Sequence, residues 1–299
     1  MSSIAYTADE NMLEYHRLCR NRTILFWRLS SKRKFADFKK GDLLFFYSRP
    51  MHGRKKGLVG YAHYDSTKRL SLTQMWNRYG EATGYADINR LSDAISRAAK
   101  GEIPKQMSCL YLTDVVFFLT PVYAEEAGIT LPANLESYTY LDRSDPGVTV
   151  NILKCAAKHG IDLWSADPTK KPEEIFHEDV VRHQLAMIHK NIGVESGSER
   201  ERNAAHRLAA KQILNEEWEL IRGSVTDCIR TDRKKVEIML PLTYQANDRD
   251  ARIRELFGRM YLYRLMAEEI GFERKICFTV CSDRNTDEIT ELVDKINHE

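Results

Sequence analysis

The sequence predicts an α+β fold, with a mainly β first half and an α/β second half built on a mixed sheet. Three observations lead to this prediction. The chain has 299 residues, about twice the ordinary length of one domain. Short apolar runs between glycine-containing and charged turns fill the first half, whereas helical periodicity alternates with strand-like runs near the end. Hydrophobic residues make up 43% of the sequence, which excludes a disordered chain.

Apolar runs of strand length organise the first half. The turn at Gly41 and Asp42 leads into an uncharged run typical of a buried strand, and a Gly- and Lys-rich connection precedes the next run. We expect these two runs to pair as a hairpin, with Gly60 where a backbone or a ligand approaches closely. The predicted strands are 23–29, 43–47, 58–64 and 107–118, and helical spacing of apolar residues predicts a helix at 88–99.

A polar segment rich in Pro, Lys, Glu, Gly and Ser separates the two halves. We expect domains at 1–165 and 201–299, joined by a connector at 166–200 that contains one helix near 179–189. The expected order in the second domain is helix, three strands, helix, strand, helix. The ranges are 201–215, 218–221, 224–229, 235–240, 251–270, 275–280 and 286–296.

Missing signals argue against several function classes. No apolar run is long enough to span a membrane, and the first residues lack a signal-peptide layout, so we expect a soluble cytoplasmic protein. The six cysteines form no Cys-x-x-Cys pair and are expected to be reduced, mostly buried thiols rather than metal ligands. The glycine motifs that bind phosphates and the nucleophile elbow are absent, which argues against nucleotide-driven motors, simple dehydrogenases and serine hydrolases.

The charge is unevenly distributed along the chain. The formal net charge is +2, but residues 1–100 hold 19 Lys and Arg against 9 Asp and Glu, a local excess of +10. Residues 101–150 hold 2 against 7, and residues 151–299 hold 24 against 27. A basic first third suggests a polyanion such as nucleic acid as partner, although a solvated basic face explains the charge equally well.

Three segments of the first half resemble one family of nucleic-acid-binding domains. They are 35–47 with its Gly-Asp turn, 56–62 with its two glycines, and 112–122, an apolar strand that ends at Pro121. Together they resemble the PUA superfamily of the EVE, ASCH and YTH kind over about 23–142, with a departure in the insert 66–85. The resemblance implies a small β-barrel that binds nucleic acid. In the EVE and YTH branches, it implies an aromatic pocket for a modified, flipped base.

The residues of this half support base binding independently of the resemblance. A flipped base regains its stacking energy between aromatic side chains, and flanking phosphates are held by Lys and Arg. Alternation along the strand places Tyr61 and His63 on one face and Tyr64 on the other. Core packing remains an alternative for every aromatic residue. The candidates are Trp27, Tyr47, Tyr61, Trp76 and Tyr79 for bases, and Arg33, Lys34, Lys39, Arg54, Lys55 and Lys56 for phosphates.

The element order of the second domain resembles the PD-(D/E)xK nuclease core. By this resemblance Asp227 and Glu237 bind Mg²⁺ or Mn²⁺, and Glu201, on the inward stripe of its helix, is a third acid. The sequence departs from the family because Met239 occupies the position of the usual lysine. Lys235 lies two residues before Glu237, on the same strand face, and is expected to replace that lysine in an active enzyme.

These patterns lead to one preferred function and two alternatives. The preferred function is a modification-dependent DNA endonuclease or defence-type restriction protein, which reads a base and hydrolyses phosphodiesters with Mg²⁺. The first alternative is a non-catalytic reader of nucleic acid whose degenerate nuclease fold serves dimerisation or scaffolding, as a homodimer. The second is a reader of modified RNA, because the resemblance implies a domain that serves RNA as often as DNA, and no residue pattern that reads a 2′-hydroxyl separates the two. We expect DNA rather than RNA as the partner.

Overall fold

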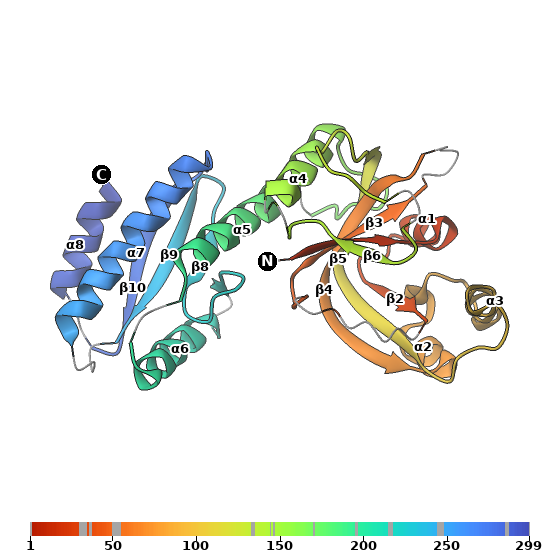
Figure 1. Cartoon of the computed structure of the whole chain (residues 1–299), viewed down its shortest axis with the longest axis horizontal. Coiled ribbons are helices and arrows are strands. Elements are labelled where there is room, and N and C mark those ends of the chain that lie inside the picture. The colour runs from red at the N-terminus through yellow and green to blue at the C-terminus, as the bar shows by residue number, and fades with distance from the viewer. Residues whose placement is uncertain are drawn as a thin grey trace. The chain divides into compact units, whose positions relative to one another are not determined.

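The computed structural model describes the chain from residue 2 to residue 298 with short gaps, and its contacts divide the chain into two compact units. The N-terminal unit spans Met1–Asp179 and the C-terminal unit Val180–Glu299, so the division falls inside one long helix, α5 (Pro172–Ile192). The residues outside the description are 1, 30–34, 36–37, 50–54, 133–134, 144, 146, 170, 195–196, 215–217, 244–247, 285–286 and 299. Figure 1 labels the elements of both units.

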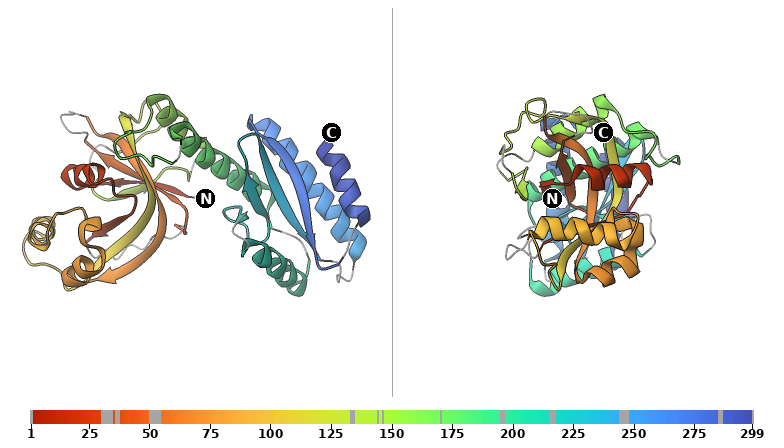
Figure 2. Two further views of the ribbon diagram at one scale, coloured as in Figure 1. Left: turned by 180° about the vertical axis from the view of Figure 1, so that it is seen from behind. Right: turned by 90° about the vertical axis from the view of Figure 1, so that its right-hand side faces the viewer.

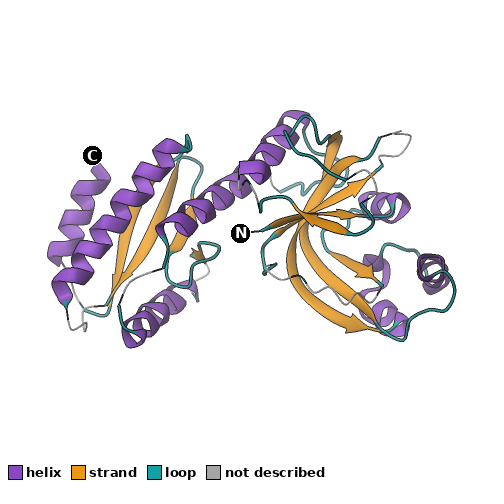
Figure 3. Cartoon of the chain, in the orientation of Figure 1, coloured by secondary structure: helices purple, strands orange, loops and turns teal. Residues whose placement is uncertain are grey.

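A mixed six-stranded sheet forms the N-terminal unit. Its strands are β1 (Ser3–Thr7), β2 (Ile24–Arg28), β3 (Leu43–Ser48), β4 (Gly57–Leu70), β5 (Met107–Val122) and β6 (Tyr138–Tyr140), in the order β2-β5-β4-β3-β1-β6. The predicted hairpin is confirmed, because β3 and β4 pair antiparallel. At Gly60 a Cβ atom would overlap the carbonyl oxygen of Val116 on β5, as expected from the close approach of two backbones. Register shifts along β4 bend the long β4–β5 pair (Figure 3).

The barrel expected for this unit is not closed among the described strands. No pairing of described residues joins the outer strands β2 and β6, so the sheet is open at both edges. The sheet stays open because its central pair of strands, β4 and β5, is long. The β4 and β5 strands run for 14 and 16 residues, and the β2 strand pairs only with the half of β5 that lies far from the β1–β3 side.

Five described helical elements complete the first unit before α5. They are α1 (Glu10–Leu18), α2 (Leu72–Tyr79), the short 3₁₀ helix η1 (Gly80–Thr83), α3 (Ile88–Ala99) and α4 (Gly147–His159). The α3 helix has the predicted bounds, and the insert at 66–85 contains the end of β4, α2 and η1. Apolar residues of α1 pack on one face of the sheet, and those of α2 and α3 pack on the opposite face over β2 and the far ends of β4 and β5.

The C-terminal unit has the predicted element order. It comprises α6 (Glu199–Ile213), β7 (Glu219–Leu220), β8 (Cys228–Thr231), β9 (Lys235–Leu242), α7 (Arg249–Glu269), β10 (Lys275–Ser282) and α8 (Asp287–His298). The sheet order is β10-β9-β8-β7, with β9 and β10 parallel and the other pairs antiparallel. The core on one face lies under α7, α8 and the second half of α5, and α6 packs on the other face (Figure 2).

The second strand of this unit begins later than the predicted range 224–229. The hydroxyl of Ser224 accepts hydrogen bonds from the backbone N–H groups of Thr226 and Asp227, which holds the chain in a turn up to Cys228. Among the helices that the structure describes, none combines the length and hydrophobicity needed to cross a membrane.

Candidate nucleic-acid interface

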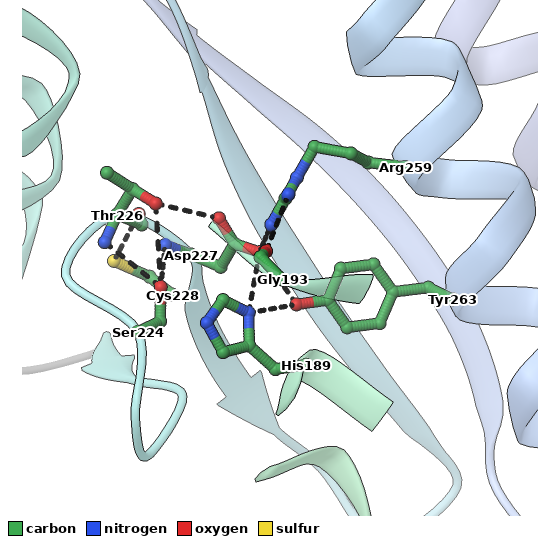
Figure 4. A network of polar contacts seen from close by, with 8 residues as sticks. All are labelled: His189, Gly193, Ser224, Thr226, Asp227, Cys228, Arg259 and Tyr263. Carbon is green, nitrogen blue, oxygen red and sulfur yellow. Dashed lines mark hydrogen bonds and ion pairs between the residues drawn. The ribbon is translucent and has the colours of Figure 1, made fainter. Parts of the chain in front are cut away.

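Asp227, the first predicted metal ligand, is fully buried and surrounded by donors. Figure 4 shows its carboxylate between α7 and α5: Arg259 donates to Oδ2 at 2.6 Å and Tyr263 at 2.7 Å. The Nδ1 atom of His189 lies 3.3 Å from the same oxygen, and the Thr226 hydroxyl donates to Oδ1 at 3.0 Å. The carboxylate is therefore enclosed by polar groups that tie α5, α7 and the turn before β8 together.

The electrostatics of this network keep Asp227 ionised. Burial by itself raises the pKa of the carboxyl, but the hydrogen bond with His189 and the positive charge of Arg259 outweigh it, and the pKa falls from 3.8 to about 2. Arg259 is itself 6% exposed, and its second nitrogen donates to the carbonyl of Gly193 at 3.0 Å. The arrangement is that of a buried ion pair in which both terminal nitrogens of the guanidinium group donate hydrogen bonds.

Glu237, the second predicted metal ligand, lies on the opposite face of the sheet. It is paired across the strands with Arg230, and Cys228 with Met239, so these four side chains share the face that α6 covers. Asp227, one residue before Cys228, points to the other face. The Nζ atom of Lys235 lies 2.5 Å from Oε1 of Glu237, and Arg230 binds Oε2. Burial raises the pKa of Glu237, but the hydrogen bonds from Lys235 and Arg230 outweigh it and lower the pKa.

The remaining parts of the predicted nuclease centre have other contacts. Glu201 closes a capping box at the start of α6, where it accepts from the backbone and hydroxyl of Ser198 at 2.7 and 2.8 Å. Met239 is buried between Cys228, Ala209 and Cys281. Arg259 of α7 points inward to Asp227.

The residues present do not fit the predicted two-carboxylate magnesium site. A shared ion needs both carboxylates on one side of the sheet at coordination distance, whereas Asp227 and Glu237 point to opposite faces and each faces an arginine. Across the described parts of the chain, no three side chains of His, Cys, Asp or Glu gather as metal ligands. The side-chain geometry therefore provides no centre for metal-assisted hydrolysis at these residues.

The predicted base-binding aromatic residues lie in three separate places. Trp27, Trp76 and Tyr79 pack against the apolar cluster under α2 and α3. Tyr61 is fully buried, and its hydroxyl donates to Asp179 at 2.6 Å. Tyr47 is 7% exposed and lies beneath the Lys56 ammonium, 5.7 Å from its ring centre. One pocket cannot include all five rings.

The prediction that Tyr61 and His63 share a strand face is confirmed. The Nε2 atom of His63 lies 2.9 Å from Asp179, the same carboxylate that Tyr61 contacts. Tyr64 packs on the other face, with its ring centre 4.9 Å from that of Phe38.

The predicted phosphate-binding residues are only partly described. Arg33, Lys34 and Arg54 lie outside the described residues. Lys39 is exposed before the start of β3, whereas Lys55 and Lys56 lie near the opposite end of that strand, just before β4. Lys55 pairs with Glu125 at 2.7 Å.

A groove that the sequence did not predict runs beside α1 in the same unit. Its volume is about 430 Å³, and it lies between the exposed side of α1 and the end of β5. The apolar lining residues are Leu13, Val59, Phe117, Phe118, Leu119 and Pro121, and the polar ones are Glu10, Glu14, Arg17, Arg49 and Asp162. An apolar floor with a polar rim of both charges is the usual composition of a small-ligand pocket.

An exposed tryptophan lies close to this groove. Trp164 is 52% exposed, its indole N–H donates to the carbonyl of Leu18 at 3.1 Å, and the Arg20 guanidinium lies 3.9 Å from the ring centre. Asp162 connects the tryptophan to the groove, because it lines the groove and binds Arg17 of α1 at 3.2 Å. The ring is therefore fixed in orientation while half of its surface faces solvent.

The groove has groups that suit a planar heterocycle, and the exposed ring of Trp164 lies two residues along the chain from its lining residue Asp162. Rings of bases stack on tryptophan, acidic rim groups accept from exocyclic amines, and arginine donates to ring nitrogens and carbonyl oxygens. Trp164, Arg17 and Arg49 were not predicted from the sequence. The position of Trp164 between Asp162 and Asp167 in a polar segment was the available signal for its exposure.

Comparison with known proteins finds similarity only among solved structures. No protein-family model matches the chain, and no curated protein matches it. The ASCH protein of Zymomonas mobilis shares 12% identity over 50% of this chain and 94% of its own, with a TM-score of 0.36. Two mutants of that protein share 12% and 11% identity over 51% of this chain and 99% and 95% of their own, with TM-scores of 0.36 and 0.37.

These structural neighbours are ASCH domains, one of the groups named by the sequence resemblance, and they cover about half of the chain. TM-scores this low carry no argument about the site. The comparisons give no support to the nuclease resemblance of the second half.

Proposed function

We propose that the N-terminal unit binds nucleic acid by taking one unstacked base into the groove beside α1. The observation that carries the proposal is the fixed, half-exposed ring of Trp164, which follows the groove-lining residue Asp162 by two positions. A folded domain gains little from leaving a tryptophan exposed, whereas a base that has left its own stack regains stacking energy on such a ring. The apolar floor with Phe117 and Phe118 supports the same ligand class.

Exposed cations near the groove provide contacts for the flanking phosphates. Arg49 lines the groove at the end of β3, and Lys55 and Lys56 precede the strand that pairs with β3. Arg20 adds a charge above Trp164. Because each neutralised phosphate releases counterions, binding is expected to weaken steeply as salt increases. Both DNA and RNA present bases and phosphates of this kind, and the preference for DNA remains our prediction.

We propose a non-catalytic role for the C-terminal unit. The burial of Asp227 against Arg259 and the separate pairing of Glu237 with Arg230 and Lys235 support this alternative over metal-dependent cleavage. In this view the unit retains acids from a nuclease-like sequence pattern but uses them to stabilise its fold.

Binding of fluorescently labelled single strands to the full chain tests the first part of the proposal. Trp164→Ala should weaken binding by about 1–3 kcal/mol, the value of one stacked base, and leave thermal stability nearly unchanged. Trp218→Phe, in the other unit, is the matched control and should bind like the parent. Equal affinity of the parent and Trp164→Ala would refute the assignment, as would binding that does not depend on salt.

A panel of DNA and RNA strands with and without modified bases then identifies the ligand. A base that fits the groove should bind more tightly than its unmodified form in the parent, and Arg17→Ala should reduce that difference. Incubation of the same strands with Mg²⁺ or Mn²⁺ tests the role of the second unit. Cleavage that Asp227→Asn and Glu237→Gln both abolish would contradict the non-catalytic role and leave base binding unaffected.

A further inference from the structure

The outward side of α7 carries a regular stripe of exposed residues. The inward side, with Leu256, Met260, Tyr263 and Ala267, belongs to the core. Tyr261 and Leu265 are 67% and 37% exposed on the opposite side. We define the α7 stripe as the exposed residues Arg254, Gly258, Tyr261, Leu265 and Glu268.

The spacing of the α7 stripe is that of a helix seam. Its positions follow one another at intervals of four, three, four and three residues, which is the heptad spacing that keeps side chains facing a partner helix. Gly258 lies in the middle of a 21-residue helix, where glycine reduces helix stability. Among the described residues, a Cβ atom at this position would meet nothing within 4 Å, so no contact with them requires a glycine there. The space above Gly258 suits a side chain from outside.

The α7 stripe is complementary to itself in antiparallel orientation. Arg254 and Glu268 lie seven residues on either side of Tyr261. If two copies of α7 cross antiparallel with a two-fold axis at Tyr261, Arg254 of each copy faces Glu268 of the other. In the same arrangement Leu265 lies within one residue of the level of the partner's Gly258, beside the open space there, and the two Tyr261 rings meet at the axis. Such reciprocal pairing is the property of an isologous dimer interface.

We propose that α7 is a homodimerisation surface on which a second copy of this chain packs antiparallel. Charge complementarity selects the second copy, because one stripe supplies both the arginine and the glutamate that the other needs. The proposal does not depend on nucleic-acid binding by the other unit. A pair of single helices buries less surface than a standard protein interface, so we expect a dimer that dissociates on dilution.

Sedimentation velocity of the full chain across a dilution series tests the proposal. The parent should shift from dimer to monomer as the concentration decreases, and Tyr261→Asp should be monomeric throughout. Arg254→Glu and Glu268→Arg should each weaken dimerisation about tenfold, because two attractive pairs become repulsive in a symmetric dimer. The double variant Arg254→Glu/Glu268→Arg should restore the parent affinity. Leu214→Asp, at an 81% exposed position outside the stripe, is the control and should dimerise like the parent.

Cross-linking provides a second measurement that does not rely on weakening the dimer. In a Cys19→Ser background, which removes an exposed native thiol, Tyr261→Cys should form a disulfide-linked dimer under mild oxidation, and Leu214→Cys should not. A parent that stays monomeric at every concentration would overturn the proposal. So would a dimer that survives Tyr261→Asp, or a double variant that fails to recover dimerisation.

Discussion

Replacing Asp227 by Asn distinguishes a structural carboxylate from a catalytic one. The buried Arg259 would then lack its anionic partner, and the removal of one member of a buried ion pair costs about 3–5 kcal/mol of stability. A carboxylate held at an active site for a metal behaves in the opposite way, since strained or repelling catalytic groups reduce stability and their removal raises it. The sign of the change in unfolding free energy therefore separates the two roles.

The pH dependence of the unfolding free energy gives a second measure of what the ionised Asp227 contributes to stability. The folded pKa of Asp227 is lowered from 3.8 to about 2, which corresponds to roughly 2.5 kcal/mol of stability. Because the folded pKa lies below the unfolded one, this contribution is fully present above about pH 4 and is lost as the pH decreases towards 2. The parent should lose stability over that acid range, and Asp227→Asn should lose less.

Urea unfolding of the full chain measures the change in unfolding free energy and its pH dependence. Hydrogen exchange of β8 and β9 then assigns these changes to the C-terminal unit. Arg259→Met should also destabilise, and the double variant with Asp227→Asn should lose about 1–3 kcal/mol less than the sum of the single changes. A gain in stability on Asp227→Asn would refute the argument, as would strictly additive effects.

Three further substitutions test the packing inside each unit. Asn297→Ala removes two hydrogen bonds, at 2.7 and 2.8 Å, by which α8 covers the outer edge of β10 at Phe278, and should cost about 1–3 kcal/mol and speed amide exchange in β10. Unchanged exchange there would contradict this role. Gly60→Ala should lower thermal stability by about 1–3 kcal/mol or more, because the new methyl group meets the backbone of β5, and a neutral result would show that the strands can separate. Trp76→Ala should cost about 2–4 kcal/mol with little change in nucleic-acid affinity, the reverse of Trp164→Ala, and a selective loss of binding would restore Trp76 as a base-binding residue.

Local sequence signals predicted those helices and strands whose ends and buried faces depend only on nearby residues. The range 88–99 was predicted as a helix from the apolar spacing of Leu91, Ala94 and Ile95, and Asp87 caps it at the expected start. The same reasoning predicted β3, β4 and the element order after residue 200. The α2 helix was missed although its capping box at Ser71 and Gln74 is a local signal, because its aromatic residues were interpreted as ligand contacts.

Only the tertiary structure determined which of the candidate site residues lie in contact with one another. The acids Asp227 and Glu237 are ten residues apart in sequence, but their separation onto two faces depends on the strand register and on where β8 begins, and a shift of one residue in that register reverses the outcome. The burial of Asp227 requires Arg259 from a helix on the far side of a crossover. The groove beside Trp164 is assembled from α1, the end of β5 and the segment after α4, which lie more than a hundred residues apart at their extremes. Periodicity reports which face of its own element a residue occupies, whereas a site is formed by the packing of several elements, so its members are fixed only when the chain folds.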